Sequence, residues 1–354
     1  MNSSSDYKTV KYNYLIKNRK FTIMNVTRIN SRSVKVLAVP VMCLILLILH
    51  FTSVCIHDHS DKPFKPFLCI LDDIMISQND ITLDMPKEVK NVVPLWPNIT
   101  KDKCIRNIKL KPRRMFTTHE NYSFYACVER NSNVKRVVKD SINRFNLDKN
   151  IIISYFGIFK MRPAPTIIEI GGYLGVMMPK LMEATGAKHY VALEPVPSFY
   201  KNFTEKIKEL QLYSTVKAYN FGLAVTQKEL QIGIHSDATS LLKDKIGKDR
   251  KTETIKIYKV IDFFVQIGLG CNSLNLLTIN CEGCEFDVIE MLTSTLLINN
   301  IEYIQFQPHR SVFSNDRVYI CRYCRLRQLL ARTHEIGYEF PNVWETWKRK
   351  DLVS

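Results

Sequence analysis

The second half of the chain alternates between short apolar runs and segments with helical spacing. The short runs predict strands at 166–170, 189–193, 215–219, 229–234, 254–260, 274–279 and 301–307. The helical spacing predicts helices at 176–185, 198–210, 286–297 and 318–333. Strands that alternate with helices predict a mostly parallel α/β sheet with helices on both faces. Its ligands are expected at the carboxyl ends of the strands.

One long apolar segment, 36–56, stands out in the first half of the chain. About 21 helical residues at roughly 1.5 Å each span about 31 Å, enough to cross a hydrocarbon layer of about 30 Å. Basic residues precede the segment, which predicts a cytosolic N-terminus. We therefore expect a single-pass, type II membrane anchor with a lumenal or extracellular remainder. A cleaved signal peptide and a buried core helix are the alternatives.

This pattern divides the chain into five regions. The stretch after the apolar segment contains scattered prolines and predicts a stem, and apolar positions then become denser and helical in spacing. The expected regions are a basic cytosolic tail, a transmembrane signal anchor, a stem, a helical cap and an α/β domain, at 1–35, 36–56, 57–115, 116–162 and 163–354.

Composition and charge limit the classes of partner. Lys plus Arg number 50 against 34 Asp plus Glu, a formal charge of +16, and part of this excess lies in the basic tail. A composition that is 46% hydrophobic and 24% charged excludes disordered and polytopic membrane proteins. The basic run 243–251 predicts a solvated loop, and a lumenal address argues against nucleic acid. Sequons at Asn98, Asn121 and Asn202 support a lumenal glycoprotein of the Golgi or endoplasmic reticulum.

Eight cysteines follow the apolar segment, and four of them form two Cys-x-x-Cys pairs, 281/284 and 321/324. Two such pairs can supply four thiolates to zinc. An oxidising compartment favours disulfides instead, and buried free thiols are a third possibility. The spacing alone leaves the pairing of the cysteines open.

The first predicted strand of the α/β domain ends in an acid followed by glycines. Glu169 precedes Gly171, Gly172 and Gly175. Glycines between a strand and a helix allow a ligand to approach bare backbone at the helix N-terminus. Tyr173 occupies the second glycine position of a nicotinamide-binding fingerprint, so that fingerprint is absent. Alone, these glycines are equally consistent with a tight turn.

A second acid strengthens the ligand-binding interpretation. Glu194 ends the next predicted strand and is followed by Pro195. A carboxylate at this position can accept both hydroxyls of a ribose. A lone glutamate at the end of a strand is more simply a solvated acid. Together with the glycine turn, however, Glu194 favours a nucleoside site.

A third motif follows the strand 274–279 and reads Asn280-Cys281-Glu282-Gly283-Cys284-Glu285. With it, the region 163–340 resembles the FkbM-type S-adenosylmethionine-dependent methyltransferases. The resemblance rests on the order and spacing of several loose motifs, at Glu169, Gly171, Gly175, Glu194, Pro195, Asn220, Gly222, the loop 238–242, Ile279, Glu282, Gly283, Glu285 and His309. Gly172 and Tyr173 stand where the family has Ala-Asn, and Asn280 stands where it has Asp.

The resemblance implies a Rossmann-like methyltransferase sheet in a membrane-anchored, animal-type member of the family. It implies S-adenosyl-L-methionine as cofactor, held by Glu169, Gly171, Gly172, Gly175, Glu194, Asn220 and Gly222. It also implies a catalytic group without a metal, formed by Asn280, Glu282, Glu285 and His309.

Methyl transfer to a hydroxyl is the reaction expected from these residues. The sulfonium is already activated, so that positioning of the acceptor supplies much of the effect. The amide of Asn280 can orient a hydroxyl but cannot act as a base, which leaves Glu282 or His309 for that role. For His309, a structural, hydrogen-bonded role is equally consistent with the sequence. A glycan or another small hydroxylated molecule is the expected acceptor.

Two other functions fit parts of the sequence. The substitutions at Tyr173 and Asn280 are consistent with an inactive, methyltransferase-like lumenal binding module. A type II glycosyltransferase shares the expected topology. Such enzymes usually need a metal-binding Asp-x-Asp motif after a strand, and the nearest acid pair in this chain, Asp72-Asp73, lies in the stem. The aromatic segment 338–347 predicts a packed closing strand more than an acceptor wall.

Overall fold

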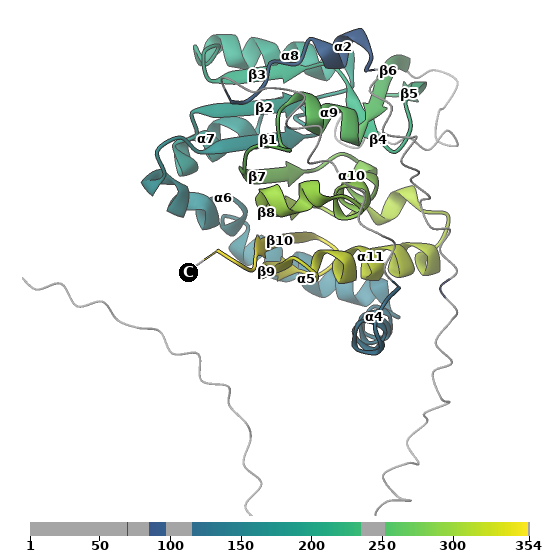
Figure 1. Ribbon diagram of the computed structural model, residues 1–354. Coiled ribbons are helices and arrows are strands. Elements are labelled where there is room, and N and C mark those ends of the chain that lie inside the picture. The colour runs from purple at the N-terminus through teal and green to yellow at the C-terminus, as the bar shows by residue number, and fades with distance from the viewer. Residues whose placement is uncertain (1–68, 70–84, 97–114, 235–251, 353–354) are drawn as a thin grey trace, which may run out of the picture. The chain divides into compact units, whose positions relative to one another are not determined.

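The computed structural model in Figure 1 describes residues 69, 85–96, 115–234 and 252–352. All of them belong to one compact unit, Pro66–Ser354. The predicted tail, the predicted membrane anchor, most of the stem, the loop 238–242 and the whole basic run 243–251 lie outside the described residues. None of the helices in the described part of the chain has the length and apolar character needed to cross a membrane.

A seven-stranded sheet forms the centre of the unit, in the order β3-β2-β1-β7-β8-β10-β9 (Figure 1). β1, β2, β7 and their neighbours β3 and β8 pair in parallel, whereas β10 is antiparallel to both β8 and β9. The strands are β1 Thr166–Ile170, β2 His189–Leu193, β3 Val216–Tyr219, β7 Leu274–Ile279, β8 Ile301–Phe306, β9 His334–Phe340 and β10 Trp344–Arg349. This is the mostly parallel, Rossmann-like sheet that the sequence predicted.

Alternate residues of the parallel strands face two different cores, because successive side chains of a strand point to opposite faces. Ile167 packs with Met178 and Phe203 beneath α7 and α8. Ile168 and Leu277 pack with α9, α10 and α11 on the other face. These helices are α7 Met177–Thr185, α8 Pro197–Glu209, α9 Val260–Gln266, α10 Cys284–Thr293 and α11 Asp316–Leu330. Helices therefore cover both faces, as expected.

Local signals explain several helix ends. Gly186 ends α7 in the left-handed conformation, with a φ of +68°, as its sequence position predicted. Pro197 occupies the first turn of α8, where a missing N–H costs little. Thr117 and Glu120 form a capping box at α4. The region 115–162 is helical throughout most of its length, with α4 Thr118–Arg130, α5 Val134–Asp148, α6 Ile151–Ser154 and the 3₁₀ helix η2 Tyr155–Met161.

A separate three-stranded sheet, in the order β4-β6-β5, was not anticipated from the sequence. β4 is parallel to β6, and β5 is antiparallel to it. The sequence predicted β5 and β6 as strands but did not predict that they form a second sheet. The remaining elements are β4 Gly222–Ala224, β5 Lys228–Gly233, β6 Thr252–Lys259, α2 Lys87–Lys90 and the 3₁₀ helices η4 Leu296–Asn300 and η5 Arg310–Val312.

Disulfides, and not a zinc site, account for both Cys-x-x-Cys pairs. Cys281 is bonded to Cys284, whereas the other pair is divided between two partners far away in the sequence. These long-range disulfides are Cys69–Cys321 and Cys127–Cys324. The described residues contain no cluster of His, Cys, Asp and Glu that could hold a metal.

The aromatic segment near the C-terminus packs, as predicted, but as two strands instead of one. It forms parts of β9 and β10, which pair with each other. Trp344 and Trp347 are buried, and the indole N–H of Trp344 donates to the side-chain oxygen of Gln305 at 3.1 Å. The segment therefore completes the sheet edge instead of lining a ligand site.

Candidate functional site

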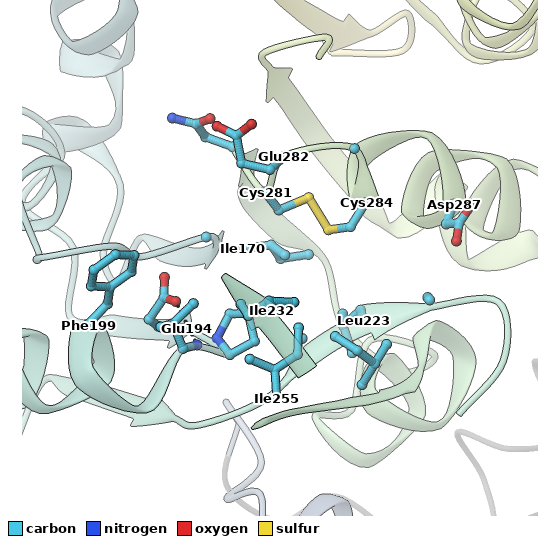
Figure 2. Close-up of a pocket in the computed structure, with 18 of the residues that line it drawn as sticks. Ile170, Glu194, Phe199, Leu223, Ile232, Ile255, Cys281, Glu282, Cys284 and Asp287 are labelled. Atoms are coloured by element: carbon cyan, nitrogen blue, oxygen red, sulfur yellow. Dashed lines mark hydrogen bonds between the residues drawn. A yellow bond between two sulfur atoms is a disulfide. The ribbon is translucent and has the colours of Figure 1, made fainter. Parts of the chain in front are cut away.

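A cavity of about 220 Å³ lies where three parallel strands end (Figure 2). Gly171 follows β1, Glu194 follows β2 and Asn280 follows β7, and all three line it. The small sheet supplies an apolar wall, formed by Leu223, Ile232, Ile255 and Ile257. In Figure 2 this wall lies across the cavity from Glu282. The cavity thus lies at the sheet edge where the sequence predicted a ligand.

The predicted site residues divide into two groups. Those that line the cavity are Gly171, Glu194, Gly222, Asn280 and Glu282. Those that do not line it are Glu169, Gly172, Gly175, Asn220, Glu285 and His309. Residues of the second group either hold residues of the first group in position or pack in the protein core.

The glycine turn serves chain packing more than direct ligand contact. A Cβ atom on Gly171 would lie 1.9 Å from the carbonyl oxygen of Asn280, and the residue has a φ of +90°. Gly172 and Gly175 lie against the ring of Phe203 in α8 instead of in the cavity. The glycines therefore let the β1 turn fit between the end of β7 and α8.

Glu194 faces the glycine turn, as the sequence predicted. Its Oε2 accepts from the N–H of Tyr173 at 2.7 Å, and its Oε1 accepts from the N–H of Val196 at 2.9 Å. Burial raises the pKa of Glu194 to about 7, against the opposing effect of these two N–H groups. The ring of Tyr173 meets that of Phe199 edge-on at 4.8 Å, and both aromatic residues line the cavity beside the carboxylate.

Glu169 does not reach the cavity, which corrects the prediction that it binds the cofactor. Strand alternation places it on the same face as Ile167, while Ile170 lines the cavity. Its Oε2 accepts from the hydroxyl of Tyr190 at 2.8 Å, and the residue is 4% exposed. Burial and the nearby charge of Glu194 raise the pKa of Glu169 to about 8, although the Tyr190 hydroxyl lowers it.

Asn220 has a supporting position. Its Nδ2 donates to the carbonyl oxygens of Glu194 and Pro195, at 2.8 and 3.2 Å. These bonds fix the backbone that carries the Glu194 carboxylate. Gly222, which lines the cavity, allows close packing, because a Cβ atom there would lie 2.8 Å from Ile257.

His309 follows β8 and lies between two carboxylates, that of Glu282 in the turn after β7 and that of Glu285 in the first turn of α10. Its Nδ1 is 3.3 Å from Glu285 Oε1, and its backbone N–H donates to the same oxygen at 2.8 Å. Its Nε2 is 3.2 Å from Glu282 Oε1, an ion-pair contact without hydrogen-bond alignment. The N–H of Gly283 donates to Glu285 Oε2 at 2.9 Å, so that the fully buried Glu285 joins the histidine to the turn.

These contacts change the role predicted for His309. Burial disfavours its charged form, but the contacts with Glu282 and Glu285 outweigh burial and raise the pKa of His309 to about 10. An imidazolium has no free lone pair and cannot act as a general base at neutral pH. Of the two candidate bases, only Glu282 both lines the cavity and retains partial exposure, at 28% of its side chain.

Several lining residues were not singled out from the sequence. They include the apolar wall of the small sheet together with Phe199, Lys228 and Asp287. Asp287 is engaged by Arg322, whose Nη2 lies 2.7 Å from Asp287 Oδ1. The alternating Ile255 and Ile257 in β6 were a signal for one apolar face, but that face could not be assigned to the cavity without the second sheet.

No family model and no curated protein matches the chain. Solved structures that resemble part of it include the methyltransferase FkbM from Methylobacillus flagellatus KT, with 10% identity and a TM-score of 0.37. That match covers 65% of this chain and 59% of the other, less than two thirds of its length. A putative tRNA (m1A22) methyltransferase, Sp1610 from Streptococcus pneumoniae, has 12% identity and a TM-score of 0.32, covering 58% and 72%.

M. capricolum TrmK in complex with S-adenosyl-homocysteine has 11% identity and a TM-score of 0.29, covering 56% of this chain and 69% of the other. Similarities at this level do not identify what this chain binds.

Proposed function

We propose that the cavity binds S-adenosylmethionine and that the protein transfers its methyl group to a hydroxyl of a glycan or another small acceptor. The observation that carries the proposal is the position of Glu194, a buried carboxylate at the end of β2. Its Oε2 accepts a hydrogen bond from the N–H of Tyr173 in the β1 turn at 2.7 Å. A carboxylate at this position of an α/β sheet is suited to ribose hydroxyls. The FkbM-type motifs at the ends of the strands support the same ligand.

The residues present fit a nucleoside. An ionised carboxylate offers about four lone-pair positions, and backbone N–H groups occupy one on each oxygen of Glu194. One position on each oxygen remains for a ribose hydroxyl. Phe199 and the apolar wall of the small sheet suit a flat base. The cavity volume of about 220 Å³ is below the roughly 300–1,000 Å³ of sites for drug-sized ligands, and it is consistent with a nucleoside-sized group.

The acceptor is placed in this proposal beside Glu282 and Asn280, which line the cavity. When bound, S-adenosylmethionine supplies an activated methyl group. The amide of Asn280 orients the acceptor hydroxyl, and a carboxylate oxygen of Glu282 takes its proton. His309 holds Glu282 through their ion-pair contact, and Glu285 holds His309. Glu285 and His309 are thus positioning residues.

We further propose that this domain is lumenal or extracellular and tethered by one N-terminal membrane helix. The apolar segment 36–56, the basic residues before it and the sequons support this topology. The disulfides Cys69–Cys321 and Cys127–Cys324 support an oxidising compartment, where such bonds persist.

Calorimetric titration of the full chain with S-adenosylhomocysteine tests the cofactor site. Glu194→Gln places an amide where two N–H donors require acceptors, and we expect affinity to fall at least about tenfold, because charged hydrogen bonds contribute roughly 1.5–3 kcal/mol. Glu169→Gln is the matched control, a buried carboxyl outside the cavity, and its affinity should equal that of the wild type. For a pKa of about 7, the ionised fraction of Glu194 falls about tenfold from pH 8 to pH 6, and wild-type affinity should fall with it.

Absence of binding by a folded wild-type protein would overturn the proposed cofactor. Equal losses in the Glu194 and Glu169 variants would show that Glu194 is not a ligand. Binding without methylated product across a panel of hydroxylated glycans would favour the inactive binding module instead.

A further inference from the structure

The Cys281–Cys284 disulfide differs from Cys69–Cys321 and Cys127–Cys324 in position, and from Cys127–Cys324 also in exposure. Both of its cysteines line the cavity and are partly exposed, and Figure 2 shows the bond beside Glu282. By contrast, Cys127 and Cys324 are both buried. In Cys69–Cys321, Cys321 is buried and Cys69 is partly exposed, but neither lines the cavity. A small molecule that enters the cavity can therefore reach the Cys281–Cys284 bond.

The same disulfide contributes less to global stability than the two long-range bonds Cys69–Cys321 and Cys127–Cys324. A disulfide stabilises mainly by restricting the unfolded chain, and the effect grows with the length of the loop that it closes. Cys281 and Cys284 are three positions apart, whereas the two long-range bonds join residues 197 and 252 positions apart. Reduction of the short bond alone is therefore compatible with a folded protein.

The bond closes a small ring around Glu282. Within it, Glu282 adopts the left-handed conformation with a φ of +54°, and Gly283 has a φ of +112°. A non-glycine residue in that conformation needs surrounding constraints to hold it there. The ring is one such constraint, and it directs the Glu282 carboxylate towards His309 Nε2 at 3.2 Å.

We propose that Cys281–Cys284 is a thiol-exchange site, and that its reduction by a glutathione-class thiol releases Glu282 from its position beside His309. The site would couple the thiol content of the compartment to the geometry of the cavity. Its effect on methyl transfer rests on the function proposed above, whereas the exchange and the movement of Glu282 do not.

The exchange balances with two equivalents of thiol. A thiolate attacks Cys281 Sγ, forms a mixed disulfide and breaks the Sγ–Sγ bond. Cys284 leaves as a thiolate at the first residue of α10, where the helix N-terminus stabilises negative charge. A second thiolate attacks the mixed disulfide at the sulfur of the first thiol. The products are the oxidised small disulfide and reduced Cys281 and Cys284, with two electrons transferred.

Differential alkylation of the folded full chain tests the exchange. The protein is incubated with graded reduced glutathione, alkylated and analysed by peptide mass spectrometry. We expect Cys281 and Cys284 to be labelled at thiol concentrations at least tenfold lower than those that label Cys127 and Cys324, with an unchanged circular dichroism spectrum. Labelling of all four together, or of Cys281 and Cys284 only on unfolding, overturns the proposal.

The positioning effect is tested by the NMR titration of the His309 ring. Reduced wild type and the double variant Cys281→Ser/Cys284→Ser should both show a lower pKa for His309 than the oxidised protein, because the Glu282 carboxylate is less firmly held. The double variant should no longer respond to glutathione. An identical His309 titration in oxidised and reduced protein overturns the positioning role. Because neither readout uses S-adenosylmethionine, this result is independent of the proposed cofactor.

Discussion

His309 provides a quantitative test of the carboxylate–histidine group, because its charge links stability to pH. Its folded-state pKa of about 10 lies above the ordinary value of 6.5. The folded protein therefore holds the proton more tightly than the unfolded chain. The resulting stabilisation is complete below pH 6.5 and is lost as the pH rises through 10. The substitution His309→Gln removes this charge while keeping a polar side chain.

The size of the effect follows from the two pKa values. One pKa unit corresponds to 1.36 kcal/mol, and between pH 7 and pH 9 the folded state holds nearly one more proton than the unfolded state. Integration over this interval gives about 2.5 kcal/mol. Between pH 7 and pH 9, the free energy of unfolding should fall more in the wild type than in His309→Gln. The expected difference between the two decreases is about 2.5 kcal/mol.

Urea unfolding of both proteins at pH 7, 8 and 9 measures this difference. Glu169 and Glu194, whose pKa values are raised to about 8 and 7, titrate in both proteins, so their contributions cancel in the comparison. His189→Gln is the control, because His189 is an exposed imidazole at the beginning of β2, and its unfolding curves should follow the wild type. Parallel pH dependence of wild type and His309→Gln would refute the charged pair.

Two further substitutions test the architecture around the cavity. Gly171→Ala combines a φ of +90° with a Cβ atom 1.9 Å from the carbonyl oxygen of Asn280. It should lower the free energy of unfolding, measured in urea, by about 3 kcal/mol or more. In the control Gly157→Ala, the nearest atom to the new Cβ is 4.0 Å away, and the free energy of unfolding should change by less than about 1 kcal/mol. Tyr190→Phe removes the hydroxyl that donates to the buried carboxylate of Glu169, and it should lower the free energy of unfolding by about 1–3 kcal/mol in the same assay. An unchanged unfolding midpoint in either Gly171→Ala or Tyr190→Phe would contradict these contacts.

Local sequence signals were sufficient for most elements of the main sheet. The predicted bounds of β1, β2 and β7 match the structure, because each is a short, mainly apolar run of which nearly all residues are buried. α9 was missed, because it has only seven residues, all of them are buried, and five of them are apolar. The small sheet was missed because β4 has only three residues, and its strands gave no signal for which neighbours they would pair with.

The site shows the same division between local and long-range information. The sequence alone placed Glu194 and Glu282 at the same edge of the sheet, because Glu194 directly follows one predicted strand, Glu282 lies in the turn after another, and parallel strands end at one edge. It also contained the alternation that excludes Glu169, since Ile167 and Glu169 share one face of β1 and Ile170 lies on the other.

Only the tertiary structure decided the charge of His309 and the partners of the cysteines. The histidine lies 27 and 24 positions from its two carboxylates, and Cys127 is 197 positions from Cys324. Neither a pKa nor a disulfide partner depends on spacing along the chain. Both depend on distance and burial in space, and these exist only after the strands and helices have packed.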